Sequence, residues 1–152
     1  MLARFGGGGA GAAMGGGAGQ GASLPAPVPE VGRVCEIGSM AQLSEIFEGH
    51  PGVLIDCWRP GCGPCVQIKP RFEALAASNE NPNLVFARVN THAAPDVAQR
   101  YQIDAVPTFI AFVHGQPTGR VRGADERKLT QLVADLAQQV PEGKYVSARM
   151  HD

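Results

Sequence analysis

A Cys-x-x-Cys motif at residues 62–65 separates a strand pattern from a helix pattern, and this feature constrains the fold most. The apolar run at 53–55 predicts a buried strand that continues to Trp58. Glycines and prolines at 60–64 end that strand, and apolar residues at helical spacing follow as far as Ala76. The two thiols are therefore expected at the first turn of a helix, just beyond the carboxyl end of a strand.

The rest of the chain continues this alternation of strands and helices. Ser39 offers a helix N-cap with Gln42 at capping-box spacing, and Pro70 inside the second helix predicts a kink. Further strands are expected at 33–37, 84–89 and 108–113, and a turn after 113 leads to an antiparallel strand that ends near Arg122. Further helices are expected after Ser39, at 94–101 and from near Asp125 to Val140. This order predicts an α/β fold with a central mixed β-sheet flanked by helices.

The composition divides the chain into three parts. Residues 1–30 hold half of the 20 glycines together with alanines and prolines, so they predict a disordered tail. Residues 31–143 are expected to form the folded domain, and residues 144–152 a short tail. The start of the chain, residues 1–5, leaves two possibilities open: a mitochondrial targeting segment, which one arginine supports poorly, or a flexible extension.

Charge and hydrophobicity exclude several classes of protein. Lys and Arg total 13 against 14 acidic residues, a net charge of −1, so no basic field predicts binding to nucleic acid or an anionic membrane. The 44% hydrophobic content can form a core, yet no apolar run approaches the roughly 18–20 residues of a membrane span. We therefore expect a water-soluble protein, and a monomer.

The position of the dithiol predicts different roles for its two cysteines. The first turn of a helix presents free N–H groups and the positive end of the helix dipole, which favour a thiolate. Cys62 is placed for this effect, so its pKa is expected below the value of a free thiol. Cys65 lies one turn further in and is expected to be more buried. Pro64 suits the first turn and stiffens the loop between the thiols.

Two other interpretations of the cysteines fit the sequence less well. A zinc site usually needs a second ligand pair, but neither Cys35 nor Cys57 belongs to another Cys-x-x-Cys, and no histidines show zinc-finger spacing. A chance pair of structural thiols fits poorly with the strand-to-helix position. Cys35 and Cys57 lie in strand patterns and are interpreted as small buried hydrophobic residues.

The stretch from Asp56 to Cys65, followed by Ala-Val-Pro-Thr at 105–108, resembles the thioredoxin family over about residues 31–140. The resemblance implies that Cys62 attacks substrate disulfides and that Cys65 resolves the mixed disulfide. It implies that Asp56 is a buried carboxyl and that Pro107 is a cis-proline facing the disulfide. Substrate-binding residues implied by position or proximity are Trp58, Gly61, Gly63, Pro64, Val106, Pro107 and Gly123, while Gly115 matches a hairpin glycine.

Each of these residues also has a purely structural interpretation. Asp56 could reach solvent at a strand end, or it could be a carboxyl with a raised pKa that exchanges protons with Cys65. Pro107 could simply begin a strand; a cis bond would expose the Val106 backbone to an extended substrate. Trp58 could belong only to the core, or it could form a wall beside the dithiol.

Two positions depart from the family pattern. Thioredoxins usually carry Trp directly before the first cysteine, and Gly61 stands there, which removes an apolar surface and loosens the loop. A lysine often found near the buried carboxylate is replaced by Arg88. An arginine paired with Asp56 would stay charged. These departures bear on substrate range and redox potential more than on the type of reaction.

The resemblance implies a protein disulfide reductase of the cytoplasm, or of mitochondria if the N-terminal segment is a presequence. It implies disulfide-containing protein substrates and an electron donor of the thioredoxin reductase type. No haem, flavin, nucleotide or metal motif is present, so the redox-active pair Cys62–Cys65 is expected to carry the electrons without a cofactor. The alternatives are a specialised donor to a peroxiredoxin and a binding module with the same fold.

Overall fold

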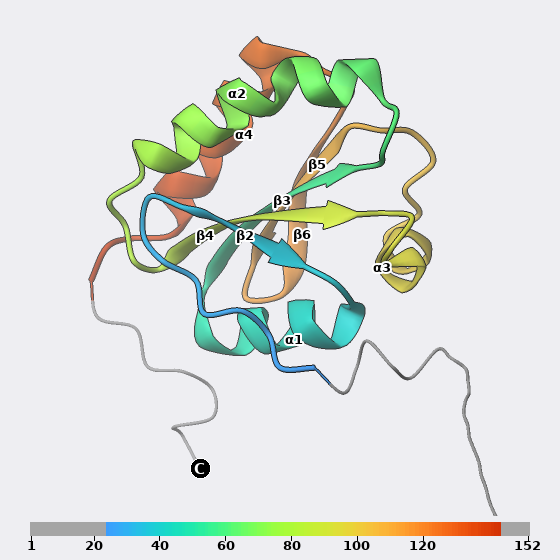
Figure 1. The fold of residues 1–152 in the computed structure, drawn as a ribbon. Coiled ribbons are helices and arrows are strands. Elements are labelled where there is room, and N and C mark those ends of the chain that lie inside the picture. The colour runs from blue at the N-terminus through green and yellow to red at the C-terminus, as the bar shows by residue number, and fades with distance from the viewer. Residues whose placement is uncertain (1–23, 144–152) are drawn as a thin grey trace, which may run out of the picture.

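The computed structural model describes residues 24–143, which form one five-stranded sheet with helices on both faces (Figure 1). The strand order is β2-β4-β3-β5-β6, with β2, β4 and β3 parallel and β5 and β6 antiparallel to their neighbours. The elements in chain order are β2 Val34–Ile37, α1 Met40–Gly49, β3 Gly52–Trp58, α2 Gly63–Ala77, β4 Leu84–Asn90, α3 Pro95–Arg100, β5 Thr108–Val113, β6 Gln116–Arg122 and α4 Glu126–Gln139. The mixed α/β sheet expected from the sequence is confirmed.

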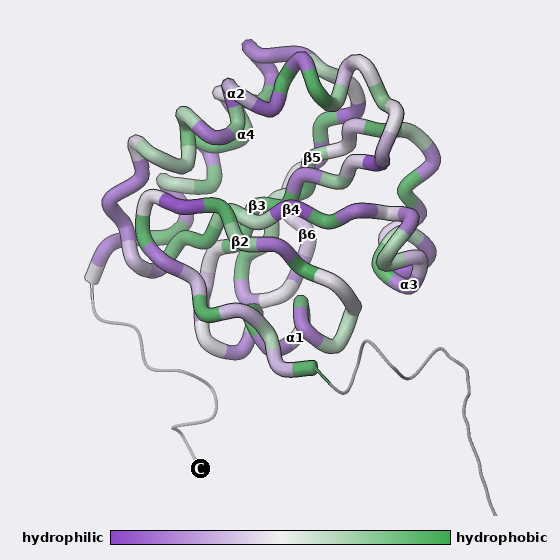
Figure 2. Tube along the Cα trace, viewed as in Figure 1, coloured by the Kyte–Doolittle hydropathy of each residue, from purple (hydrophilic) through white to green (hydrophobic). Residues whose placement is uncertain are grey.

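The sheet divides the hydrophobic core into two layers. Successive side chains of a strand point to opposite faces, so Val53 and Ile55 of β3 pack with α1 and α3, whereas Leu54 packs with α2 and α4. The hydrophobic colour lies along the central strands β3 and β5 (Figure 2). The two layers fix α2, and with it the dithiol, over the end of β3.

Side-chain caps set where the helices begin. The Ser39 Oγ accepts from the Gln42 N–H at 3.1 Å, which confirms the expected cap of α1. The Asp125 carboxylate accepts from the Lys128 N–H at 3.0 Å at the start of α4. Helix α2 continues through Pro70 to Ala77. Among residues 24–143, no helix is long and apolar enough to cross a membrane.

The segment before β2 contacts α1 on the face of the sheet opposite α2. The Gln42 amide donates to the Pro25 carbonyl at 2.9 Å and accepts from the Gly38 N–H at 2.6 Å, and Ala26 packs on the core layer beneath α1. These contacts begin before residue 31, where composition alone places the start of the domain. The expectations for residues 1–23 and 144–152, including a targeting segment, lie outside the described residues.

Candidate active site

The dithiol occupies the N-terminus of α2, as the sequence predicts. Cys62 is the N-cap in an extended conformation, and its Sγ accepts from the Cys65 N–H at 3.2 Å. The two cysteines form a disulfide with their Cα atoms 5.3 Å apart. Cys62 is 6% exposed and Cys65 2%, so the first cysteine is slightly more accessible. The arrangement places a two-electron redox pair at the positive end of a 15-residue helix.

The loop before β5 closes over the disulfide from the other side. The Val106–Pro107 peptide bond is cis, and the Cys62 Sγ lies 3.8 Å from the Val106 carbonyl oxygen. The Pro107 carbonyl accepts from the Gly123 N–H at 2.8 Å, which ties this loop to the end of β6. Of the predicted substrate-facing residues, Val106 therefore lies beside Cys62, and its neighbour Pro107 is joined to Gly123.

Glycine and proline leave the approach to Cys62 free of bulky side chains. Gly61, Gly63 and Pro64 are all exposed, and a Cβ at Gly61, Gly63 or Gly123 would meet nothing within 4 Å. Gly61 has φ of +77°, in the left-handed region that favours glycine. The loop that carries the first cysteine thus has both an open surface and a backbone suited to the residue found there.

Asp56 is a buried carboxyl on β3 that pairs with Arg88 of β4. It is 1% exposed, and its Oδ2 accepts from the Arg88 Nε at 3.2 Å. No hydrogen-bond partner among the described residues reaches its Oδ1. Burial raises the pKa of Asp56 to about 6, against the lowering effect of Arg88. A carboxyl with this pKa can accept a proton near neutral pH, and the solvent-exposed strand end considered from the sequence is wrong.

Trp58 also lies against Arg88. The Arg88 Cζ is 4.4 Å from the centroid of the indole ring, a cation–π distance. The Trp58 carbonyl accepts from the Thr91 N–H at 2.8 Å, so the end of β3 is fixed to the loop after β4. The sequence did not predict this stack, since it depends on the alignment of two strands that are far apart in the chain.

The remaining cysteines are free. Burial raises the pKa of Cys35 to about 11 and that of Cys57 to about 12. Both thiols are therefore protonated at neutral pH and are poor nucleophiles. Cys57 is a buried core residue, as the sequence predicts, whereas Cys35 is only half-buried at the edge of the core. Gly115 lies in the β5–β6 turn with φ of +78° and faces Phe47 of α1, as a hairpin glycine.

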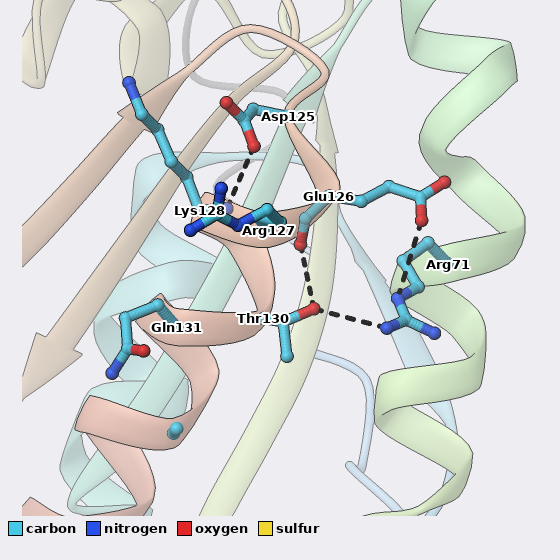
Figure 3. Close-up of a pocket in the computed structure, with 8 residues that line it drawn as sticks. Arg71, Asp125, Glu126, Arg127, Lys128, Thr130 and Gln131 are labelled. Carbon is cyan, nitrogen blue, oxygen red and sulfur yellow. Dashed lines mark hydrogen bonds and ion pairs between the residues drawn. The ribbon is translucent and has the colours of Figure 1, made fainter.

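A surface hollow between α2 and the start of α4 lies outside the dithiol loop (Figure 3). The Arg71 guanidinium lies 3.9 Å from the Glu126 carboxylate and donates to the Thr130 hydroxyl at 3.5 Å across it. These exposed contacts join the two helices. None of the residues that line this hollow is a predicted site residue.

Comparisons with known proteins agree with this geometry. The family model described as Thioredoxin matches residues 39–138. Thioredoxin of Mycoplasma pneumoniae is 38% identical over 102 residues, which cover 66% of this chain and 98% of that protein. The crystal structure of Malassezia sympodialis thioredoxin superposes with a TM-score of 0.65 at 34% identity and covers 72% of this chain and 95% of that one.

A longer protein also contains a similar segment. The peptide-N(4)-(N-acetyl-beta-glucosaminyl)asparagine amidase of Caenorhabditis elegans is 38% identical over 103 residues, and the matched segment spans 17% of its length. The shared unit is thus the dithiol domain. With its Cys62–Cys65 disulfide and these relatives, the domain is a dithiol–disulfide oxidoreductase of the thioredoxin type. The chain belongs to the thioredoxin family.

Proposed function

We propose that the protein reduces disulfide bonds in other proteins. The observation that carries the proposal is the Cys62–Cys65 disulfide at the start of α2, beside an open surface. The strand that leads to it carries a buried carboxyl, Asp56. In the reduced protein, the Cys62 thiolate attacks one sulfur of a substrate disulfide. A mixed disulfide forms and the other substrate sulfur leaves as a thiolate.

The second step regenerates the disulfide seen in the structure. Cys65 loses its proton to Asp56 and attacks the Cys62 sulfur, and the second substrate sulfur leaves as a thiolate. Two electrons have then passed to the substrate. Asp56 suits this role because its pKa of about 6 leaves it mostly ionised at neutral pH while it remains a useful acceptor.

The substrate is proposed to be an extended segment that carries a disulfide. Cys62 and the Val106 carbonyl lie 3.8 Å apart, so a chain whose sulfur reaches Cys62 would place its backbone next to Val106. The open positions at Gly61 and Gly123 would admit side chains of several sizes. Trp58, Gly63, Pro64 and Pro107 complete the proposed contact surface.

The dithiol must be restored by an electron donor, which we propose to be a reductase of the thioredoxin reductase type. The bifunctional thioredoxin reductase/thioredoxin of Mycobacterium leprae supports this pairing; it is 31% identical over 110 residues and this chain matches 23% of it. We further propose that the protein acts as a monomer in the cytoplasm, with mitochondria as the alternative, and needs no cofactor besides its own disulfide.

Reduction of insulin disulfides tests the proposed function. The wild-type protein, supplied with dithiothreitol, is expected to accelerate insulin precipitation, and Cys62→Ser is expected to abolish the acceleration. Cys57→Ser is the matched control, because that thiol is buried and protonated. Cys65→Ser is expected to trap substrates on Cys62 as mixed disulfides. A wild-type rate no faster than that of Cys62→Ser would contradict the proposal.

A further inference from the structure

One guanidinium joins two side chains of β3, the strand that leads to the dithiol. Arg88 lies opposite Glu36 of β2 on one side and opposite Asp56 of β3 on the other, so three charged residues form a row across the parallel strands. It is 6% exposed, its Nε bonds to Asp56 at 3.2 Å, and its Cζ lies 4.4 Å from the Trp58 ring centroid. A single buried cation thus contacts both the carboxyl and the indole.

An arginine can make both contacts, whereas a lysine cannot make them in the same way. The guanidinium is planar, so its edge can donate to a carboxylate while its face lies on an aromatic ring. A lysine ammonium is a compact charge on a flexible stem and holds no ring by stacking. The residue type at position 88 therefore decides whether Asp56 and Trp58 are held by the same group.

No hydrogen bond among the described residues fixes the Trp58 ring. Trp58 is the single tryptophan of the chain, and no hydrogen-bond acceptor among the described residues reaches its Nε1. Gly61, on the outer side of the loop, contributes no side chain. Trp58 is thus the aromatic residue closest in sequence to the dithiol, and its ring is held by packing and by the stack on Arg88.

We propose that Arg88 is a positioning residue of the disulfide reductase, which holds the Trp58 indole and the Asp56 carboxyl in a fixed arrangement at the end of β3, the strand that leads to the dithiol. The kinetic part of this inference rests on the proposed function; the structural part does not. The other charged groups that act on Asp56 are Glu36 of β2 and Lys69 of α2. Both remain in place when Arg88 is replaced.

Two substitutions separate the contacts of Arg88. Arg88→Lys keeps a positive charge but removes the planar group, and Arg88→Met removes both. The matched control is Arg100→Lys, because Arg100 is an exposed residue of α3 whose guanidinium also lies over an aromatic ring, 5.2 Å from the Tyr101 centroid. Acrylamide quenching of fluorescence reports directly on the single tryptophan. Insulin reduction gives KM and kcat, and rapid mixing gives the rate of the resolving step.

The expected result for Arg88→Lys is a freer indole. Quenching of Trp58 should rise by about twofold or more, and KM for insulin should rise about three- to tenfold, the range that loss of a buried cation–π contact allows. The resolving step should change by less than about threefold, because a charge remains near Asp56. In Arg88→Met the resolving step should also slow and its pH profile should move to higher pH. Arg100→Lys should match the wild type in every measurement.

A double-mutant cycle keeps the proposal falsifiable if a variant is poorly stable. If Arg88 acts on KM through the indole, Arg88→Lys should have no further effect on KM in a Trp58→Leu background, which has no aromatic ring at position 58, after correction for the folded fraction. Additive effects, or wild-type quenching in Arg88→Lys, would overturn the proposal. A wild-type protein that reduces no insulin would refute the proposed function alone, since quenching still tests the arrangement of Trp58.

Discussion

Asp56→Asn tests the proposed proton acceptor through both stability and rate. The wild-type carboxyl is 1% exposed and burial raises its pKa from an ordinary 3.8 to about 6. At about 1.4 kcal/mol per pH unit, this difference means that ionised Asp56 costs the folded protein about 3 kcal/mol. Because this pKa already includes the attraction of Arg88, the neutral Asn should raise the free energy of unfolding at neutral pH by up to about 3 kcal/mol.

The sign of the effect fixes its pH dependence. Because the folded-state pKa is raised, the folded protein holds the Asp56 proton more tightly than the unfolded chain does. This group therefore lowers the free energy of unfolding as pH rises from about 3.8 to about 6, and adds no further change above that range. The advantage of Asp56→Asn should be small near pH 4 and full above pH 6. Urea unfolding across this range measures it, with Asp135→Asn on exposed α4 as the control.

Asp56→Asn should slow the resolving step although it stabilises the fold. Without the carboxylate, Cys65 must lose its proton to water, so we expect the resolving step to slow about tenfold or more near neutral pH. Rapid mixing with a disulfide substrate should show the mixed disulfide on Cys62 accumulating in Asp56→Asn, while the initial attack is little changed. Resolution at the wild-type rate between about pH 6 and 8 would refute the role of Asp56 as proton acceptor.

Three further predictions concern the rest of the site and its surroundings. In the reduced protein, limiting iodoacetamide should label Cys62 before Cys65 because the helix dipole acts on the first thiol; peptide mapping that finds Cys65 labelled first would reverse the assignment. A chain that begins at Glu30 should reduce insulin at the full rate but lose about 1 kcal/mol of stability in urea, because the Gln42–Pro25 hydrogen bond is lost. Gly61→Trp should lower the free energy of unfolding, measured in urea, by about 1–2 kcal/mol, because φ at position 61 is +77°. Gly49→Ala should not lower it, because Gly49 lies in a helix and has open space around it.

The sequence predicts the strands and helices because each has a strong local pattern. The apolar residues of α4 recur on one side, and residues 53–55 form a continuous apolar strand, so their type and position follow from periodicity. The position of the dithiol can then be predicted as well, because residues 62–65 lie between the predicted strand and the predicted helix. The Ser39 cap is local as well, since donor and acceptor are three residues apart.

Contacts between strands that are far apart in the sequence cannot be predicted from local patterns. Arg88 and Asp56 are 32 residues apart, and their pairing depends on the register of β3 and β4, in which a shift of one residue would turn Arg88 to the other face. The Trp58 stack depends on that register too. The bond from Gln42 to Pro25 depends on the path of a segment without regular structure, which composition assigned to the tail.

Gly61 shows how sequence and conformation combine at the site. The sequence shows a missing side chain, which suggests that a tryptophan could restore the usual surface. The structure shows that the backbone at this position is left-handed and that no neighbour lies within 4 Å of an added Cβ. An added Cβ would therefore meet a conformational cost rather than a steric one. The open approach to Cys62 is due to the loop conformation as much as to the absent side chain. The aromatic residue nearest the dithiol in the chain is then Trp58, whose ring stacks on Arg88.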